Sequence, residues 1–140
     1  MQMKHYCISF EGIDKTGKEL VGKYVDILGK HKYVLMDRGL ISNITYARMF
    51  GREYEYDVEQ FRNWVFVHLV CDEADWKVRC KLTKEPEIDF FKNTNEFAAT
   101  FKNFRDLGFN VLTFNTSHYT PYDIATMIIQ HMEKLNEERN

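Results

Sequence analysis

Proline and glycine are scarce in this chain, and their scarcity limits how the chain can be organised. Only two prolines and seven glycines occur among 140 residues, and no stretch is rich in proline, glycine and serine. A stretch of that kind is the usual mark of a domain boundary, and the sequence contains no internal repeat either. We therefore expect residues 1–140 to form a single domain.

Cysteine is also rare, and its positions exclude several kinds of site. Cys7, Cys71 and Cys80 form no CxxC pair, and their spacing fits no zinc site. An odd number of cysteines makes a poor disulfide framework. We expect all three to be reduced thiols in or near the core.

Long apolar runs and an excess of charge of one sign are missing as well. The longest strongly apolar run, residues 64–71, is too short for a membrane span and contains His68, which we expect in the core. The first residues hold no signal-peptide stretch, so we expect a cytoplasmic protein with no membrane partner. A formal net charge of −2 argues against bulk nucleic-acid binding, so any phosphate binding needs a local basic cluster.

Apolar residues make up 44% of the chain, which is enough for a folded core. Their spacing alternates between short apolar runs, typical of buried strands, and helical periodicity. Strands are predicted over residues 6–10, 33–36, 64–71 and 109–114. Helices are predicted over residues 18–28, 42–50 and 73–82, over a stretch that ends at Gly108, and from residue 121 onward, with a shorter one at 58–62. Strands that alternate with helices need crossover connections, so we predict an α/β fold with a mainly parallel, four-stranded sheet.

The turn after the first predicted strand carries a glycine-rich motif. Residues 12–18 read Gly-Ile-Asp-Lys-Thr-Gly-Lys and satisfy the pattern GxxxxGK. Glycines let such a loop turn tightly, so that its N–H groups point inward around phosphate oxygens, and the following helix adds its positive end. A chance glycine turn is the alternative interpretation. Because the motif stands between a strand and an amphipathic helix, we predict a nucleoside triphosphate site and a P-loop NTPase-like, three-layer fold.

Two blocks of this sequence resemble a known family. Residues 10–18 resemble the opening of thymidylate kinases and related deoxynucleoside monophosphate kinases, many of them phage-encoded. Residues 37–43, which begin Asp-Arg-Gly and are followed by Tyr46, resemble the Asp-Arg motif of the same family. Weaker similarity covers residues 70–87, where the family has its lid, and residues 115–119, where it packs the adenine.

The resemblance implies a role for each matching residue. The nucleotide-binding residues it implies are Gly12, Ile13, Asp14, Lys15, Thr16, Gly17, Lys18, Glu19 and Leu20. The implied catalytic residues are Lys18, Asp14, Lys15, Arg38 and Arg79. The implied acceptor site consists of Asp14, Arg38, Ser42 and Tyr46. ATP is the implied donor, and Asp37 is implied to help hold Mg²⁺ through its water shell.

Each of these residues also has an ordinary structural interpretation. Asp14 is at home in a turn, and Asp37 with Arg38 fits a polar strand end. Lys81 and Lys84, which fall near the lid, fit a solvated helix end equally well.

The sequence departs from the family at Glu19. A P-loop has Ser or Thr at this position to hold Mg²⁺, and this chain has a longer and negatively charged side chain. The carboxylate could bind the metal itself, or repel the nucleotide by roughly 4 kcal/mol at 4 Å with an effective dielectric near 20. It could also turn outward, where the dipole of the helix favours an acid in the first turn.

A second departure is the length of the chain after the first predicted helix. The resembled kinases have a further strand and several helices there, which supply part of the acceptor site, and this chain has only residues 30–32 before the next strand. A pocket with one wall missing suggests a homodimer in which a second copy covers it.

Three functional hypotheses follow. The favoured one is phosphoryl transfer from ATP to a deoxynucleoside monophosphate, with a thymidylate-like acceptor and with nucleotides as the ligands. The second is a non-catalytic nucleotide-binding or regulatory protein derived from a P-loop kinase. The third keeps catalysis but has a smaller acceptor or a site completed by a second subunit.

Overall fold

A computed structural model describes residues 4–13, 15–84 and 89–137 of the chain. Its order of elements alternates strands with helices, as the apolar pattern predicts. The strands are β1 (Cys7–Glu11), β2 (Val34–Asp37), β3 (Trp64–Val70) and β4 (Asn110–Asn115). The helices are α1 (Lys18–Leu28), α2 (Leu40–Met49), a 3₁₀ turn η1 (Val58–Phe61), α3 (Glu73–Leu82), α4 (Phe90–Asp106) and α5 (Pro121–Glu137).

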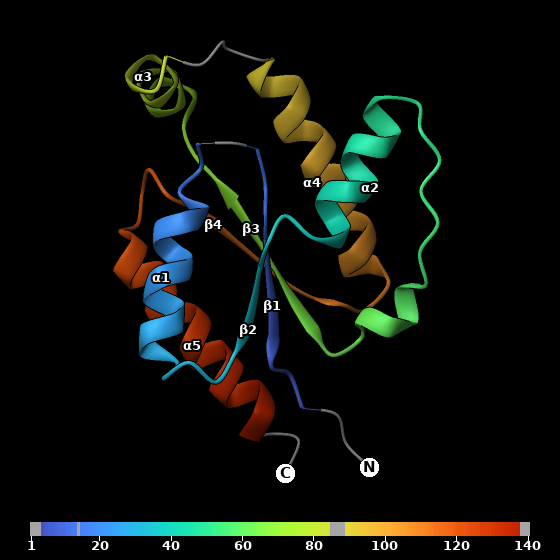
Figure 1. The fold of residues 1–140 in the computed structure, drawn as a ribbon, viewed down its shortest axis with the longest axis vertical. Helices are drawn as coiled ribbons and strands as arrows, with labels where there is room; N and C mark the ends of the chain where they lie inside the picture. Colours follow the sequence, from blue (N-terminus) through green and yellow to red (C-terminus); the bar gives the residue numbers. More distant parts are fainter. Residues whose placement is uncertain (1–3, 14, 85–88, 138–140) are drawn as a thin grey trace.

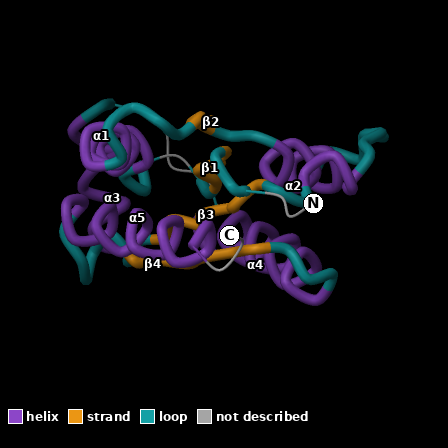
Figure 2. Tube along the Cα trace, turned by 90° about the horizontal axis from the view of Figure 1, so that it is seen from below, coloured by secondary structure: helices purple, strands orange, loops and turns teal. Residues whose placement is uncertain are grey.

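The four strands form one parallel sheet in the order β2-β1-β3-β4 (Figures 1 and 2). This confirms the predicted α/β fold class. Helices α1 and α5 pack together on one side of the sheet, and α2 and α4 pack on the other. The loop after β1 and helix α3 lie at the carboxyl ends of the strands, which is where ligands of parallel α/β sheets bind.

Alternation along the strands divides the core into two halves. Ile8 and Phe10 of β1 face α1 and α5 together with Val65, Val67 and Leu69 of β3. Phe66 of β3 faces the other way, into a cluster that includes the α4 side chains Phe97, Phe101 and Phe104. These three α4 side chains are therefore part of the core.

The ends of the helices show which local signals decide the fold. The N–H of Asp123 donates to the hydroxyl of Thr120 at 3.1 Å, so the predicted start of α5 is confirmed. Asp72 precedes α3, but its side chain does not cap that helix. It accepts from Asn115 at 3.0 Å instead, and thereby ties the ends of β3 and β4 together.

A buried carboxylate anchors α2 to the end of β1. Glu11 is fully buried, and its oxygens accept from the N–H groups of Gly39, Ile41 and Ser42 at 2.8, 3.2 and 3.1 Å. They also accept from the hydroxyls of Ser42 at 2.6 Å and Ser9 at 2.9 Å. Burial raises the pKa of Glu11, and these hydrogen bonds act in the opposite direction. Glu11 therefore satisfies the first N–H groups of a helix that has no cap side chain of its own.

His68 occupies the middle of β3, in the core as predicted. Its ring is 4% exposed and stacks on Phe101 with 4.3 Å between centroids and an interplanar angle of 8°. Burial is the main cause that lowers the pKa of His68 to about 4, and the nearby charges of Lys18 and Arg105 act in the same direction. His68 is therefore neutral in the folded protein at physiological pH.

We expect Glu11→Gln to destabilise the fold by about 2 kcal/mol or more. Every described partner of this carboxylate is a donor, and an amide nitrogen cannot accept from any of them. Urea unfolding checks this, with the exposed Glu19→Gln as a matched control that should change stability by less than about 0.5 kcal/mol. Equal stability of Glu11→Gln and wild type would contradict the anchoring role.

His68→Phe should flatten the dependence of stability on pH. The unfolded chain binds a proton on His68 below its ordinary pKa of 6.5, whereas the folded protein resists protonation down to about 4. The free energy of unfolding of the wild type should therefore fall by about 3 kcal/mol as the pH falls across this range. The variant keeps an aromatic ring against Phe101 and should not show this decrease. Unfolding measurements between pH 7.5 and 4 test this. If the free energy of unfolding of wild type and of His68→Phe depended on pH in the same way, His68 would not resist protonation in the folded protein.

Candidate functional site

The glycine-rich loop joins β1 to α1 and takes a conformation that needs glycine at two positions. Gly12 has a φ of 136°, and a Cβ there would lie 2.5 Å from the carbonyl oxygen of Leu69. Gly17 has a φ of 95° and precedes the first turn of α1. Asp14, predicted to be catalytic and to contact the acceptor, lies outside the described residues.

Lys18 folds back into this loop. Its ammonium donates to the carbonyl oxygens of Ile13 at 2.7 Å and Gly12 at 3.3 Å, and to the hydroxyl of Thr16 at 3.4 Å. The Thr16 hydroxyl itself donates to Ile13 at 2.9 Å. Burial lowers the pKa of Lys18, and the carboxylates of Asp37 and Glu11 partly offset this. The ammonium is thus held inside the loop, at the place where the sequence predicts phosphate oxygens.

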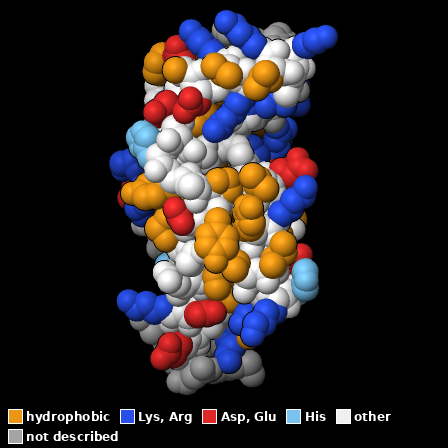
Figure 3. Space-filling model, turned by 90° about the vertical axis from the view of Figure 1, so that its left-hand side faces the viewer, with side chains coloured by type: hydrophobic (Ala, Val, Ile, Leu, Met, Phe, Trp, Pro, Cys, Tyr) orange, Lys and Arg blue, Asp and Glu red, His pale blue; other side chains and the backbone are white. Residues whose placement is uncertain are grey.

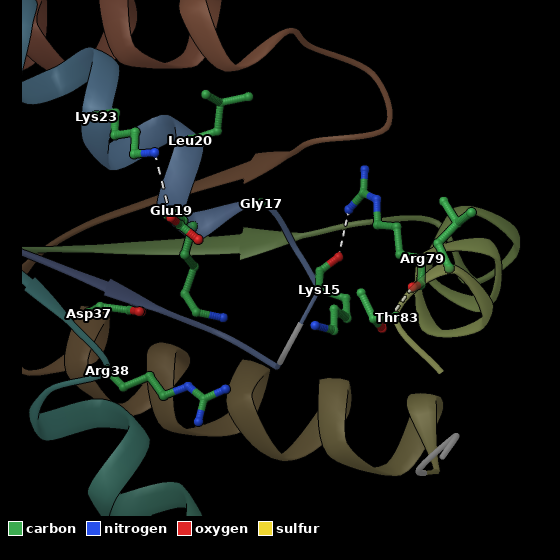
Figure 4. A pocket seen from close by; sticks show the side chains of 11 residues that line it. Lys15, Gly17, Glu19, Leu20, Lys23, Asp37, Arg38, Arg79 and Thr83 are labelled. Carbon is green, nitrogen blue, oxygen red and sulfur yellow. Dashed lines mark hydrogen bonds and ion pairs between the residues drawn. The ribbon is translucent and has the colours of Figure 1, made fainter. Parts of the chain in front are cut away.

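A cavity of about 460 Å³ opens beside the loop (Figure 4). Its charged lining is mostly basic. The lining residues are Lys15, Gly17, Lys18, Glu19, Leu20, Lys23, Asp37, Arg38, Arg79, Leu82 and Thr83. Five basic side chains against two carboxylates give this cavity a positive balance although the whole chain carries a net charge of −2. This is the local basic cluster that phosphate binding requires.

Two of the basic residues have strained backbone conformations. Lys15 and Arg38 both lie in the left-handed region, with φ of 67° and 62°. Their side chains extend from the loop and from the end of β2 into the same space (Figure 4). The N–H of Arg38 donates to Phe10 at 2.8 Å, which continues the sheet one residue beyond β2. Strain of this kind at a basic, cavity-lining position is typical of a functional site.

Arg79 connects α3 to the loop. Its guanidinium donates to the carbonyl oxygen of Lys15 at 2.7 Å and to the hydroxyl of Thr116 at 3.4 Å. The predicted lid arginine is thus brought to the loop and to residues 115–119, which the sequence predicts near the adenine. Lys81 and Lys84 are exposed and do not line the cavity, so they behave as a solvated helix end.

The two residues that follow the lysine line the cavity, but their side chains are exposed to solvent. The Glu19 side chain is 86% exposed and forms an ion pair with Lys23 at 3.6 Å, and Leu20 is 47% exposed. Of the three alternatives that the sequence leaves open for Glu19, the structure shows a solvent-exposed carboxylate that pairs with Lys23. No group of three or more metal-ligating side chains occurs among the described residues. Asp37 lines the cavity near Lys18, and one carboxylate together with phosphate oxygens and water is a common Mg²⁺ ligand set.

Two predicted acceptor residues do not line the cavity. Ser42 is buried, and its hydroxyl is engaged by Glu11. Tyr46 stacks on Phe50 and meets Phe97 edge-on. Their spacing on α2 is correct for one helix face, but that face packs on the sheet and on α4, so the structure does not support a direct acceptor contact for either side chain.

The role of Glu11 was not predicted from the sequence. Its signal was a carboxylate at the end of an apolar strand, directly before the first glycine of the loop. A charged group in such a position is buried only where donors surround it. Its partners lie about 30 residues away, so no local pattern identifies them.

None of the helices in the described part of the chain is long and apolar enough to cross a membrane.

No protein-family model matches the chain, and no curated protein matches it. Among solved structures, it is similar to the YorR protein from Bacillus subtilis, whose crystal structure is of a complex with phosphorylated GDP. The superposition has a TM-score of 0.64 and covers 91% of this chain and 95% of that chain, at 19% sequence identity. The chain therefore shares the fold of that protein, which agrees with the predicted P-loop NTPase-like fold.

Proposed function

We propose that this protein is a nucleotide kinase that transfers the γ-phosphoryl group of ATP to a deoxynucleoside monophosphate, with a thymidylate-like acceptor. The observation that carries the proposal is the buried ammonium of Lys18, held within a glycine loop that opens into a basic cavity. The two strong sequence blocks, residues 10–18 and 37–43, meet at this cavity through Lys18 and Arg38.

The donor half of the site rests on the loop, α1 and α3. Phosphate oxygens would replace the loop carbonyls as partners of Lys18 and accept from the loop N–H groups. The N-terminus of α1 adds its positive end at the same place. That YorR, which shares the fold, was crystallised with phosphorylated GDP supports nucleotide binding here.

The transfer step needs position and positive charge more than covalent participation by the protein. An oxygen of the acceptor phosphate forms a bond to the γ-phosphorus, and the bond to the β,γ-bridging oxygen breaks, so that ADP leaves. Lys15, Lys18 and Arg38 would neutralise the charge on the transferred group. Mg²⁺, which Asp37 would help hold, supplies further charge neutralisation when bound.

A second candidate function is nucleotide binding without transfer. The outward orientation of Glu19 favours it, because the usual hydroxyl ligand for Mg²⁺ is then missing from the loop. The burial of Ser42 favours it as well. Formation of ADP and a nucleoside diphosphate from ATP and a panel of deoxynucleoside monophosphates distinguishes the two functions.

The homodimer predicted from the sequence stays a prediction. One apolar surface available for it lies on the outer face of α1 and α5, where Figure 3 shows hydrophobic side chains gathered near the middle of the molecule. Leu20, Ile27, Tyr119 and Tyr122 are each about half exposed or more, and Tyr24 packs edge-on against Tyr122.

Lys18→Ala should weaken ATP binding about 100-fold or more, because several charge-assisted hydrogen bonds to phosphate are lost together. Isothermal titration measures the affinity, and circular dichroism checks that the sheet and helices persist. Lys102→Ala is the matched control, since this lysine pairs with Asp106 on the outer side of α4. Unchanged ATP affinity of Lys18→Ala would refute the proposed phosphate site.

Glu19→Ala should change the affinity for ATP by less than about fivefold, because the carboxylate is exposed and its pairing with Lys23 is a surface ion pair. Glu19→Ser restores a short hydroxyl at the usual metal position and should increase the effect of Mg²⁺ on ATP affinity. Titrations with and without Mg²⁺ test both variants. A large loss of Mg²⁺-dependent binding in Glu19→Ala would instead identify Glu19 as a metal ligand.

A further inference from the structure

A second cavity lies between α1 and β2 and has about the same size as the first. Its volume is about 450 Å³. Its lining combines an apolar floor with charged residues. The lining residues are Phe10, Lys18, Glu19, Gly22, Lys23, Asp26, Tyr33, Leu35, Met36 and Asp37. We call this cavity the α1–β2 groove.

The groove exists because little chain separates α1 from β2. Only residues 29–33 connect the two elements, and β2 is an edge strand. Helix α1 packs mainly against α5, so part of β2 stays uncovered. Leu35, whose side chain shares the α1 face of the sheet with Phe10, is only partly buried. The apolar floor of the groove is thus accessible from solvent.

Gly22 keeps the groove open from the side of the helix. Glycine is a poor helix former, and this one stands in the middle of α1. A Cβ at Gly22 would have Phe10 as its nearest neighbour, at an ordinary contact distance of 3.8 Å. The packing of the fold therefore does not require a glycine here. A side chain at this position would project toward Phe10 and into the groove.

The two cavities meet at four residues. Lys18, Glu19, Lys23 and Asp37 line both of them. Each volume falls in the range of sites for one small ligand. In phosphoryl transfer the donor and acceptor phosphates must touch, so residues common to both cavities mark the place where they would meet.

We propose that the α1–β2 groove is the acceptor subsite, which binds the base and sugar of a nucleoside monophosphate and directs its phosphate to Lys18 and Lys23. This inference rests on the proposed kinase function. The floor of Phe10 and Leu35 suits a flat heterocycle, and the carboxylate of Asp26, which pairs with His31 at 2.7 Å, stands at the rim as a hydrogen-bond acceptor. The acceptor then occupies the opposite side of β2 from Ser42 and Tyr46.

Titration of ¹⁵N-labelled protein with thymidine monophosphate, followed by NMR, tests the inference directly. The amides of Gly22, Leu35 and Met36 should shift with thymidine monophosphate, whereas inorganic phosphate should shift only the loop and Lys18. Shifts confined to α2 would overturn the groove assignment and leave the kinase proposal intact. Concentration-dependent shifts of the groove amides without ligand would identify a second copy as the occupant and also overturn it.

Gly22→Leu places a side chain in the groove at a residue that does not itself line the first cavity. It should weaken binding of thymidine monophosphate about tenfold or more and leave ATP affinity within about twofold of wild type. Gly22→Ala is the conservative control, with a small loss of monophosphate affinity and a raised melting temperature. Equal monophosphate affinity in Gly22→Leu and wild type would refute the inference. Absence of ATP binding in the wild type would refute the proposed function itself.

Discussion

The carboxylate of Glu11 is the group on which the geometry of the site depends. It stands at the end of β1 and receives the first N–H groups of α2, so one side chain fixes the junction between β2 and α2. That junction sets the position of Arg38, the residue before the bonded Gly39. The same charge favours the cationic form of Lys18. Glu11 therefore links the glycine-rich loop to the end of β2 through a fully buried carboxylate, where electrostatic interactions are strong.

The loop compensates internally for the burial of Lys18. An ammonium removed from water needs partners, and here the loop carbonyls and Thr16 supply them. In the proposed function, phosphate oxygens would take over these bonds. Arg79 stiffens the other side of the loop by bonding the carbonyl of Lys15, so α3 and the loop form one unit. Several residues of the site thus bond to one another in the absence of a ligand, as the proposed phosphoryl transfer would require.

The short connection between α1 and β2 has two consequences with one physical origin. The chain lacks the segment that forms part of the acceptor site in the resembled kinases. The apolar floor of the α1–β2 groove is therefore left uncovered. Apolar surface of this kind next to a basic cavity is a common setting for binding a flat ring that carries phosphate. The carboxylate of Glu19 pairs with Lys23, whereas the charge of Asp37, which lines both cavities, acts on Lys18.

The order of strands and helices, the glycine loop and the core position of His68 could be predicted from the sequence, because each depends on neighbours a few residues away. Apolar periodicity places α1 within its observed bounds, and the start of α5 follows from Thr120 and Pro121. The anchor at Glu11, the burial of Ser42 and the α1–β2 groove could not be predicted in this way. These depend on partners about 30 residues apart or on which helix covers which strand. The orientation of the Glu19 side chain likewise depends on which nearby charge it pairs with. Residue spacing alone does not predict that this partner is Lys23.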